Sequence, residues 1–267
     1  MPCFVCSTCG TQFAEMHAPP GECPICTDDR QYVGWGGQQW TTPTALARDH
    51  AIRIADDDGI RGYDITPGFG IPQRMALVPT GEGNVLWESL SLVTDAALAD
   101  IRSRGGAAAI AISHPHFYTA MVDWSDALGG IPIFLHAEDR QWVQRTAPQI
   151  RFWEGKVHAL SNDARLIHCG GHFAGSCALH VDGGVDGKGA LFCGDTLQVT
   201  MDRRRVSFMH SFPNAIPLPE KDVLTIKERL ADYAFDRAYG YSRGRNILGD
   251  ARMAVDASIA AYLSINH

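Results

Sequence analysis

A histidine pair after an apolar run, a lone histidine, and an aspartate after another apolar run stand in order in this sequence. Ser113-His114-Pro115-His116 follows residues 107–112, Gly171-His172 comes after Gly170 beyond the strand-like segment 164–169, and Gly194-Asp195 follows residues 190–193. Each run has the length of a buried strand. Strand ends can bring a histidine pair, a lone histidine and an aspartate together as the ligands of a metal ion. The pattern predicts a metalloenzyme whose ligands are supplied by strand ends.

Composition and charge narrow the function classes. The chain has 267 residues, of which 45% are hydrophobic, enough for one large core with a small appendage. A net charge of -7 argues against a nucleic-acid partner, because phosphate binding depends on clustered lysine and arginine. The sequence shows neither an apolar stretch that could span a bilayer nor the basic and apolar blocks of a secretory signal. We therefore expect a soluble, cytoplasmic protein without a membrane partner.

Four cysteines near the N-terminus form two Cys-x-x-Cys knuckles. Cys6 and Cys9 make the first and Cys23 and Cys26 the second, with 13 residues between them. Each knuckle brings two thiolates together, and two knuckles complete a closed tetrahedral site for zinc, or less often for iron. About forty residues bury too little apolar surface to be stable alone, and a bound metal supplies the missing stability. The segment resembles a rubredoxin-like zinc ribbon, expected over residues 1–38, with the main domain over residues 39–267.

The charge of this segment bears on its role. Its one basic residue, Arg30, stands against four acidic residues, Glu15, Glu22, Asp28 and Asp29. The acidic balance disfavours nucleic-acid binding and favours a docking or subunit-contact role, including a homo-oligomer formed through the ribbon. A thioredoxin-like redox pair is the alternative, but it requires a single Cys-x-x-Cys at the start of a helix in a strand-helix-strand unit.

The main domain shows two successive groups of expected elements. In its first half, strands are expected at 51–54, 75–78, 84–87, 107–112 and 131–135, and helices at 95–101, 117–128 and 138–145. Thr94 is a suitable N-cap for the first of these helices, and Gly105-Gly106 would end it. In the second half, strands are expected at 164–169, 176–181, 190–193 and 206–209, and helices at 220–233 and 250–263. Two sheets covered by helices are the simplest packing of this α+β pattern.

Four ordered motifs resemble those of metallo-β-lactamase-fold proteins of the broad hydrolase and glyoxalase-like group. They are Gly83-Asn84-Val85-Leu86-Trp87, Ser113-His114-Pro115-His116, Gly171-His172-Phe173-Ala174-Gly175-Ser176 and Leu191-Phe192-Cys193-Gly194-Asp195-Thr196-Leu197. The resemblance covers roughly residues 50–267 and implies an αββα sandwich with the metal at one edge, held by loops that follow the strands. It also implies that His114, His116 and His172 are imidazole ligands of the first metal, and that Asp195 is the carboxylate that normally bridges two metals.

The chemistry of these residue types agrees with that implication. Neutral imidazole suits zinc, and a tetrahedral ion with three protein ligands keeps a fourth position open for a water molecule, whose pKa falls to about 7. Pro115 disfavours helical backbone for His114 and holds the pair in an extended loop. Three histidines and one aspartate also permit iron, as in nonhaem sites that activate oxygen or sulfur compounds. Zinc is therefore the expected ion, with iron as the alternative.

The sequence departs from this family at the second metal. The first family motif normally reads His-x-His-x-Asp-His, and here Tyr118 and Thr119 fill its last two places. The fifth family histidine, expected near Tyr239-Gly240-Tyr241, is missing as well. These losses leave Asp195 alone to hold a second ion, so we predict one metal. The Tyr118 hydroxyl could hydrogen-bond a metal-bound water or an oxyanion, or the side chain could simply fill the vacated volume.

Three functions are compatible with this pattern. The first is a hydrolase with a mononuclear site that attacks a small ester, lactone or thioester by metal-activated water, with Asp195 and Tyr118 as candidate catalytic residues. The second is a noncatalytic binding or scaffolding protein of the same fold, which the missing second-metal ligands suggest. The third is an iron-dependent thiol or oxygen enzyme. His136 and His210 are further candidates to contact the ligands or the substrate.

Overall fold

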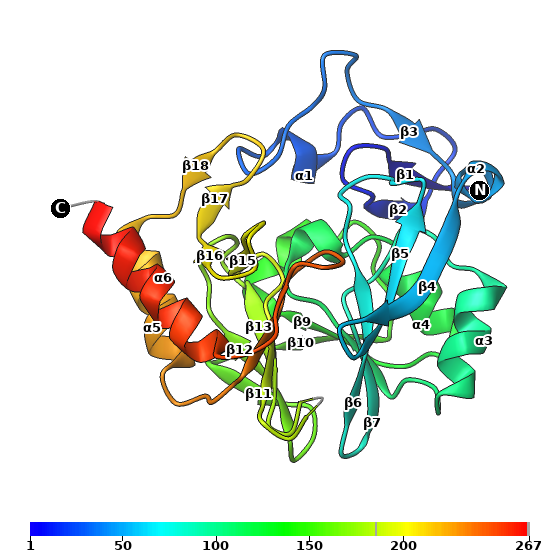
Figure 1. The fold of residues 1–267 in the computed structure, drawn as a ribbon. Helices are drawn as coiled ribbons and strands as arrows, with labels where there is room; N and C mark the ends of the chain where they lie inside the picture. Colours follow the sequence, from blue (N-terminus) through cyan, green and yellow to red (C-terminus); the bar gives the residue numbers. More distant parts are fainter. Residues whose placement is uncertain (185, 266–267) are drawn as a thin grey trace.

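The computed structural model, which describes residues 1–184 and 186–265, contains two large β-sheets that pack face to face (Figure 1). Their facing sides bury one cluster of apolar side chains, and the outer side of each sheet buries a further cluster against helices. These layers form the αββα sandwich of the α+β class that the sequence predicts. A small N-terminal module lies across one end of the sandwich, at the top of Figure 1.

The first sheet joins an antiparallel meander to a parallel half. Its order is β10-β9-β8-β7-β6-β5-β4, and its strands are β4 (Ala51–Asp57), β5 (Ile60–Thr66), β6 (Met75–Thr80), β7 (Gly83–Trp87), β8 (Ala109–Ala111), β9 (Ile133–His136) and β10 (Ile150–Trp153). Strands β4 to β7 pair antiparallel and β7 to β10 pair parallel. The outer face packs against α3 (Asp95–Ser103) and α4 (Met121–Ala127). Thr94 caps α3 as predicted, because its hydroxyl accepts the N–H of Ala97 at 3.3 Å.

The second sheet is antiparallel except where β14 meets β19. Its order follows β11 (Val157–Ala159), β12 (Ala164–His168), β13 (Cys177–Val181), β14 (Ala190–Phe192), β19 (Arg237–Tyr239) and β20 (Asn246–Ile247). Helices α5 (Glu220–Leu230) and α6 (Ala251–Ile265) cover its outer face. Two small hairpins lie beside it, β15 (Gln198–Val199) with β16 (Val206–Ser207) and β17 (Met209–Ser211) with β18 (Ile216–Pro217). Among the described residues, no helix has the length and apolarity needed to cross a bilayer.

Two expected helices differ from the prediction: one starts later, and the other is a 3-10 helix. The helix expected over 117–128 starts only at Met121, because Thr119 has a positive φ of 21° and its hydroxyl lies 2.5 Å from the hydroxyl of Ser89. The helix expected over 138–145 is a 3-10 helix, η2 (Ala137–Trp142). Within it, Asp139 turns inward to accept the N–H of Gly175 at 2.9 Å. A long-range contact in each segment therefore overrides the local helical pattern.

The N-terminal module is a three-stranded sheet that carries both cysteine knuckles. Strands β1 (Cys3–Cys6), β2 (Gln12–Glu15) and β3 (Trp40–Thr41) pair in the order β2-β1-β3, and short helices α1 (Pro24–Thr27) and α2 (Pro43–Asp49) accompany them. The ribbon sheet thus extends past residue 38, since β3 belongs to it. Trp40 packs edge-on against Phe13, with ring centroids 5.0 Å apart.

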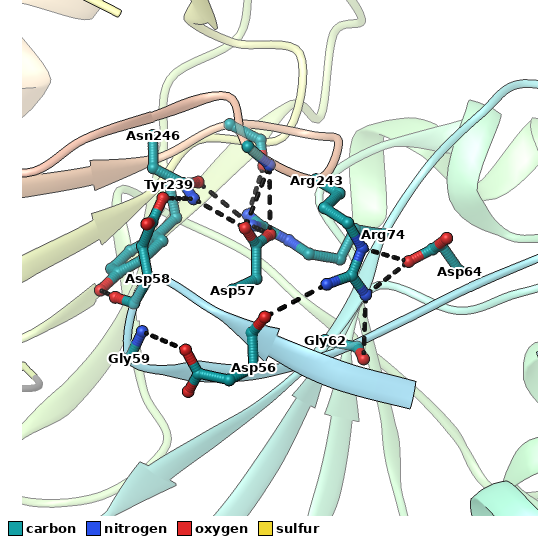
Figure 2. Close-up of polar contacts among 12 residues, drawn as sticks. Asp56, Asp57, Asp58, Gly59, Gly62, Asp64, Arg74, Tyr239, Arg243 and Asn246 are labelled. Carbon is teal, nitrogen blue, oxygen red and sulfur yellow. Dashed lines mark hydrogen bonds and ion pairs between the residues drawn. The ribbon is translucent and has the colours of Figure 1, made fainter. Parts of the chain in front are cut away.

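The buried ion pair of Arg74 and Asp57 belongs to the first sheet, on the side of the β4–β5 hairpin, and Arg74 also bonds to the second sheet (Figure 2). The Arg74 guanidinium donates to Asp57, to the side-chain oxygen of Asn246 at 3.1 Å and to the carbonyl oxygen of Gly240 at 2.6 Å. Its backbone N–H also donates to the carbonyl oxygen of Tyr241 at 2.8 Å. Arg74 therefore anchors the segment after β19, where the missing fifth family histidine was expected.

Candidate metal centre

The loop after β8 carries the histidine pair. His114 has an extended backbone, with φ -169° and ψ 172°, as expected before Pro115, and the 3-10 turn η1 (Pro115–Phe117) follows it. The Ser113 hydroxyl lies 2.7 Å from Nδ1 of His114, which leaves the Nε2 atom of that ring free to face the centre. The backbone N–H of Ser113 donates to Oε2 of Glu88 at 3.1 Å. The end of β7 thus anchors the loop.

Loops after β12 and β14 supply the third histidine and the aspartate. Nδ1 of His172 lies 3.1 Å from the carbonyl oxygen of Met209, so Nδ1–H donates and Nε2 keeps its lone pair. Gly194 has a φ of +53°, and a Cβ atom there would overlap the Ser113 side chain. Glycine is therefore required for the tight approach that places Asp195 beside the histidine loop.

The four predicted ligands converge on one point, which we call the His/Asp centre. One ligand atom from each of His114, His116, His172 and Asp195 lies within 4.8 Å of the other three. Nε2 of His172 is 3.2 Å from Nδ1 of His116, and Nε2 of His114 is 3.5 Å from Oδ2 of Asp195. The exposed fractions of the four residues are only 1 to 6%.

The donor set fits a divalent cation. Nε2 of His114 and Oδ1 of Asp195 are buried and have no hydrogen-bond partner among the described residues. Buried polar atoms are normally paired, and a bound cation would pair these. Burial lowers the pKa of His116, and burial lowers the pKa of His172 to about 3, so both rings are neutral at neutral pH. Neutral imidazoles beside one carboxylate are the ligands expected for zinc.

The positions of the second-metal ligands are filled by side chains without that function. Tyr118 is 2% exposed and packs in the apolar cluster beneath the first sheet, and burial raises the pKa of its hydroxyl. The Thr119 hydroxyl is engaged with Ser89. In the segment where the fifth histidine was expected, Tyr239 stacks on Phe192, with ring centroids 4.8 Å apart, and Tyr241 lies at the cavity beside His172 and Asp195. This packing agrees with the space-filling interpretation of Tyr118, and its catalytic role stays a prediction.

The four knuckle cysteines form a second metal-binding group in the N-terminal module. Their Sγ atoms lie within 4.8 Å of one another, with 3.5 Å between Cys6 and Cys26 and 3.7 Å between Cys9 and Cys23. The four residues are at most 1% exposed. The Gln38 side chain donates to Sγ of Cys6 at 3.2 Å, a contact that supports a thiolate. A closed four-cysteine site of this kind suits a structural metal ion.

A cavity of about 190 Å³ opens over the His/Asp centre, and the ribbon forms part of its wall. His116, His172 and Asp195 lie at the cavity. The ribbon contributes Thr8, Gln31 and Tyr32, and the main domain contributes Gly70, Ile71, Pro72, Gln198, Phe212, Pro213 and Tyr241. No local sequence motif marks these ribbon residues as part of the cavity.

The segment after the second knuckle attaches the ribbon to the metal-site loops. Nε of Arg30 donates to the carbonyl oxygen of His172 at 2.6 Å, and the guanidinium lies 4.6 Å from the ring centroid of Phe173. The side-chain amide of Asn214 donates to the carbonyl oxygens of Asp29 at 3.0 Å and of Gln31 at 2.9 Å. The ribbon therefore docks within its own chain, and a homo-oligomer contact through its remaining surface stays a prediction.

The two further candidate histidines lie elsewhere. His210 pairs with the carboxylate of Asp29 in the ribbon at 2.9 Å, so it helps to hold the ribbon in place. His136 forms a third potential metal-binding group with Glu138 and His168. The rings of His136 and His168 stack with centroids 3.9 Å apart and planes 14° apart. A metal must lie in the plane of each imidazole, and stacked parallel rings do not share such a point, so this group is a poor site.

The structural comparisons identify the fold. FIM-1 from Pseudomonas aeruginosa, a metallo-beta-lactamase solved in a mono-zinc form, matches with a TM-score of 0.55 at 15% identity, covering 83% of this chain and 100% of that chain. The metallo-beta-lactamase from Pontibacter korlensis matches with a TM-score of 0.54 at 13% identity, covering 79% of this chain and 98% of that chain. The chain has the metallo-β-lactamase fold, as its motifs predict.

Sequence similarity places the chain more narrowly. No protein-family model matches it. It is 38% identical over 266 residues to the uncharacterized protein YmaE of Bacillus subtilis (strain 168), and the match covers 98% of this chain and 96% of that protein. The chain belongs to the same family as YmaE.

Proposed function

We propose that this protein is a metal-dependent hydrolase that binds one metal ion at the His/Asp centre and cleaves a small ester, lactone or thioester. The convergence of His114, His116, His172 and Asp195 at a cavity supports this function. The filling of the second-metal positions by other side chains supports one ion. Zinc is the favoured ion from the donor set, with iron as the alternative. FIM-1, described in a mono-zinc form, is a precedent for one zinc ion on this fold.

When bound, the ion would supply a Lewis acid and a water molecule of lowered pKa. The protein residues orient these groups. Ser113 and the carbonyl of Met209 hold His114 and His172 through their Nδ1 atoms, so both Nε2 atoms face the centre. With one carboxylate oxygen of Asp195 on the ion, the other oxygen would be available to accept a proton from an attacking water. The ribbon and the cavity wall shield this carboxylate from most of the solvent, since Asp195 is 6% exposed.

Elemental analysis combined with an activity panel tests this function. Wild-type protein should contain one ion in each of the two sites and should hydrolyse at least one class of small ester, lactone or thioester. His172→Ala should lose one ion and all turnover, while the ribbon ion stays. Absence of turnover above a His114→Ala control across the whole panel would favour the noncatalytic alternative. Iron content with oxygen uptake on thiols would favour the oxygen enzyme.

A further inference from the structure

We propose that Gln31 of the zinc ribbon is a substrate-binding residue that selects small, uncharged carbonyl compounds. This inference rests on the proposed function, because it assigns a ligand to the same cavity. It also gives the ribbon a role in recognition beyond its structural metal. The substrate site would then be built from both parts of the chain.

The hydrogen bonding of Gln31 carries the argument. The residue is 7% exposed and lines the cavity together with His116, His172 and Asp195. Its backbone N–H donates to the carbonyl oxygen of Asp28 at 3.1 Å, and its own carbonyl accepts from Asn214. Its side-chain amide makes no hydrogen bond to any residue that the structure describes. The amide atoms of Gln31 are not among the fully buried unpaired atoms, so they are accessible from the cavity, where a ligand can replace the water that would otherwise pair them.

The backbone of Gln31 is held in place from both sides. Arg30, the preceding residue, donates to the carbonyl of His172, and its own carbonyl accepts the hydroxyl of Ser211 at 3.0 Å. The Asn214 amide bridges the carbonyls of Asp29 and Gln31. A binding group fixed by its neighbours loses little conformational freedom when a ligand arrives. Gln31 is thus positioned in advance relative to the metal-binding residues.

The cavity wall indicates the chemical class of the ligand. Apart from Asp195 and the histidines, its polar side chains are uncharged, and no lysine or arginine lines the described cavity. The nearby Arg30 is occupied by Asp28 and the carbonyl of His172. A carboxylate or phosphate on the ligand would be buried beside Asp195 without a cationic side chain to pair it, which is unfavourable. The Gln31 amide can donate to a carbonyl oxygen or accept from a hydroxyl, and about 190 Å³ admits only a small molecule.

A binding titration tests the proposal without requiring turnover. Metal-loaded wild type, Gln31→Leu and Gln31→Glu would be titrated calorimetrically with acetohydroxamic acid (below, acetohydroxamate), a small probe that is uncharged in neutral solution. The matched control is Gln39→Leu, since Gln39 is an exposed glutamine of the same module. Gln31→Leu should bind about fivefold more weakly than wild type, which corresponds to the loss of one neutral hydrogen bond. Gln31→Glu, which places a second carboxylate near Asp195, should bind more weakly still.

A second titration tests the ligand class. The monohydroxamate of succinic acid, which adds a carboxylate, should bind wild type at least tenfold more weakly than acetohydroxamate. Metal content of each variant confirms that ribbon and centre are intact. Equal affinity of all four proteins for acetohydroxamate, no binding to wild type, or preference for the anionic probe would overturn the proposal. Failure of the proposed function would instead appear as absent ester turnover, with the binding differences preserved.

Discussion

Nε of Arg30 lies 2.6 Å from the carbonyl oxygen of His172, so a zinc-ribbon residue bonds directly to the backbone of a metal-binding residue. The two residues are 142 positions apart in the chain. The contact joins the four-cysteine module to the His/Asp centre through one hydrogen bond, and Phe173 supports the same guanidinium with its ring face. The ribbon therefore acts as part of the site and not as an independent appendage.

Replacing Arg30 should weaken this junction. Arg30→Ala removes the bond to the His172 carbonyl and the ion pair with Asp28. We expect the free energy of unfolding in urea to fall by about 1–2 kcal/mol, since one partly buried charged donor is lost. Arg48→Ala, which replaces an exposed arginine of the same region, should change the free energy of unfolding by less than about 0.5 kcal/mol. Equal effects of the two substitutions would show that the junction contributes no stability.

The buried pair of Arg74 and Asp57 should be more sensitive than any surface pair (Figure 2). The two side chains are 2% and 5% exposed, so Arg74→Leu leaves an uncompensated carboxylate in the interior. We expect a loss of about 3–5 kcal/mol in the free energy of unfolding. Lys156→Ala breaks an ion pair whose side chains are 67% and 69% exposed. This substitution should change the free energy of unfolding by less than about 1 kcal/mol. Comparable losses in the two variants would contradict the burial argument.

Asp139 should make the protein less stable as pH rises. Burial raises the pKa of Asp139 to about 7, whereas an unfolded aspartate has a pKa of about 3.9. Between these values the folded state binds a proton that the unfolded state lacks, so this group's contribution to stability is lost as pH rises. Asp139→Asn removes the titration. The free energy of unfolding of Asp139→Asn minus that of wild type should therefore increase by on the order of 3 kcal/mol from about pH 4 to about pH 7.

Denaturant unfolding at several pH values measures this difference. Asp49→Asn, at an exposed aspartate, serves as the control and should track wild type across the range. Parallel pH profiles for wild type and Asp139→Asn would exclude a protonated Asp139 in the folded protein.

Substitution of Tyr118 separates its two interpretations. Tyr118→Phe keeps the packed ring and removes a hydroxyl that makes no hydrogen bond within the described chain. On the space-filling interpretation, metal content should be unchanged and kcat/KM should stay within about twofold of wild type. A loss of about tenfold or more with full metal content would assign the hydroxyl a catalytic role instead.

The metal sites could be predicted from the sequence because their signals are local. The Cys-x-x-Cys spacing defines the candidate ribbon ligands, and His114, His172 and Asp195 each come shortly after a strand, so they meet at one edge of the sandwich, where strands of both sheets end. The sandwich layers follow from the same alternation of apolar runs and helices. Pro115 correctly indicated the extended backbone of His114.

The remaining features depend on contacts between distant segments. Gln31 and Arg30 reach the site only because the ribbon folds back over it. The ribbon sequence contains no motif that predicts this docking position. The helix expected over 117–128 is interrupted at Thr119 by a contact with Ser89, 30 positions away. The carboxyl group of Asp139 is likewise buried because it packs against Gly175. A Cβ atom added to Gly175 would lie 2.7 Å from Cγ of Asp139. Such pairings are set by the tertiary structure.

The most direct test of the account is the number of metal ions per chain, measured by elemental analysis on three proteins. Wild type should contain two ions, one in the four-cysteine site and one in the His/Asp centre. His172→Ala and the Cys6→Ser, Cys9→Ser double variant should each retain one, at opposite sites. Three ions in wild type, or no loss of metal in His172→Ala, would contradict a mononuclear centre built by His114, His116, His172 and Asp195.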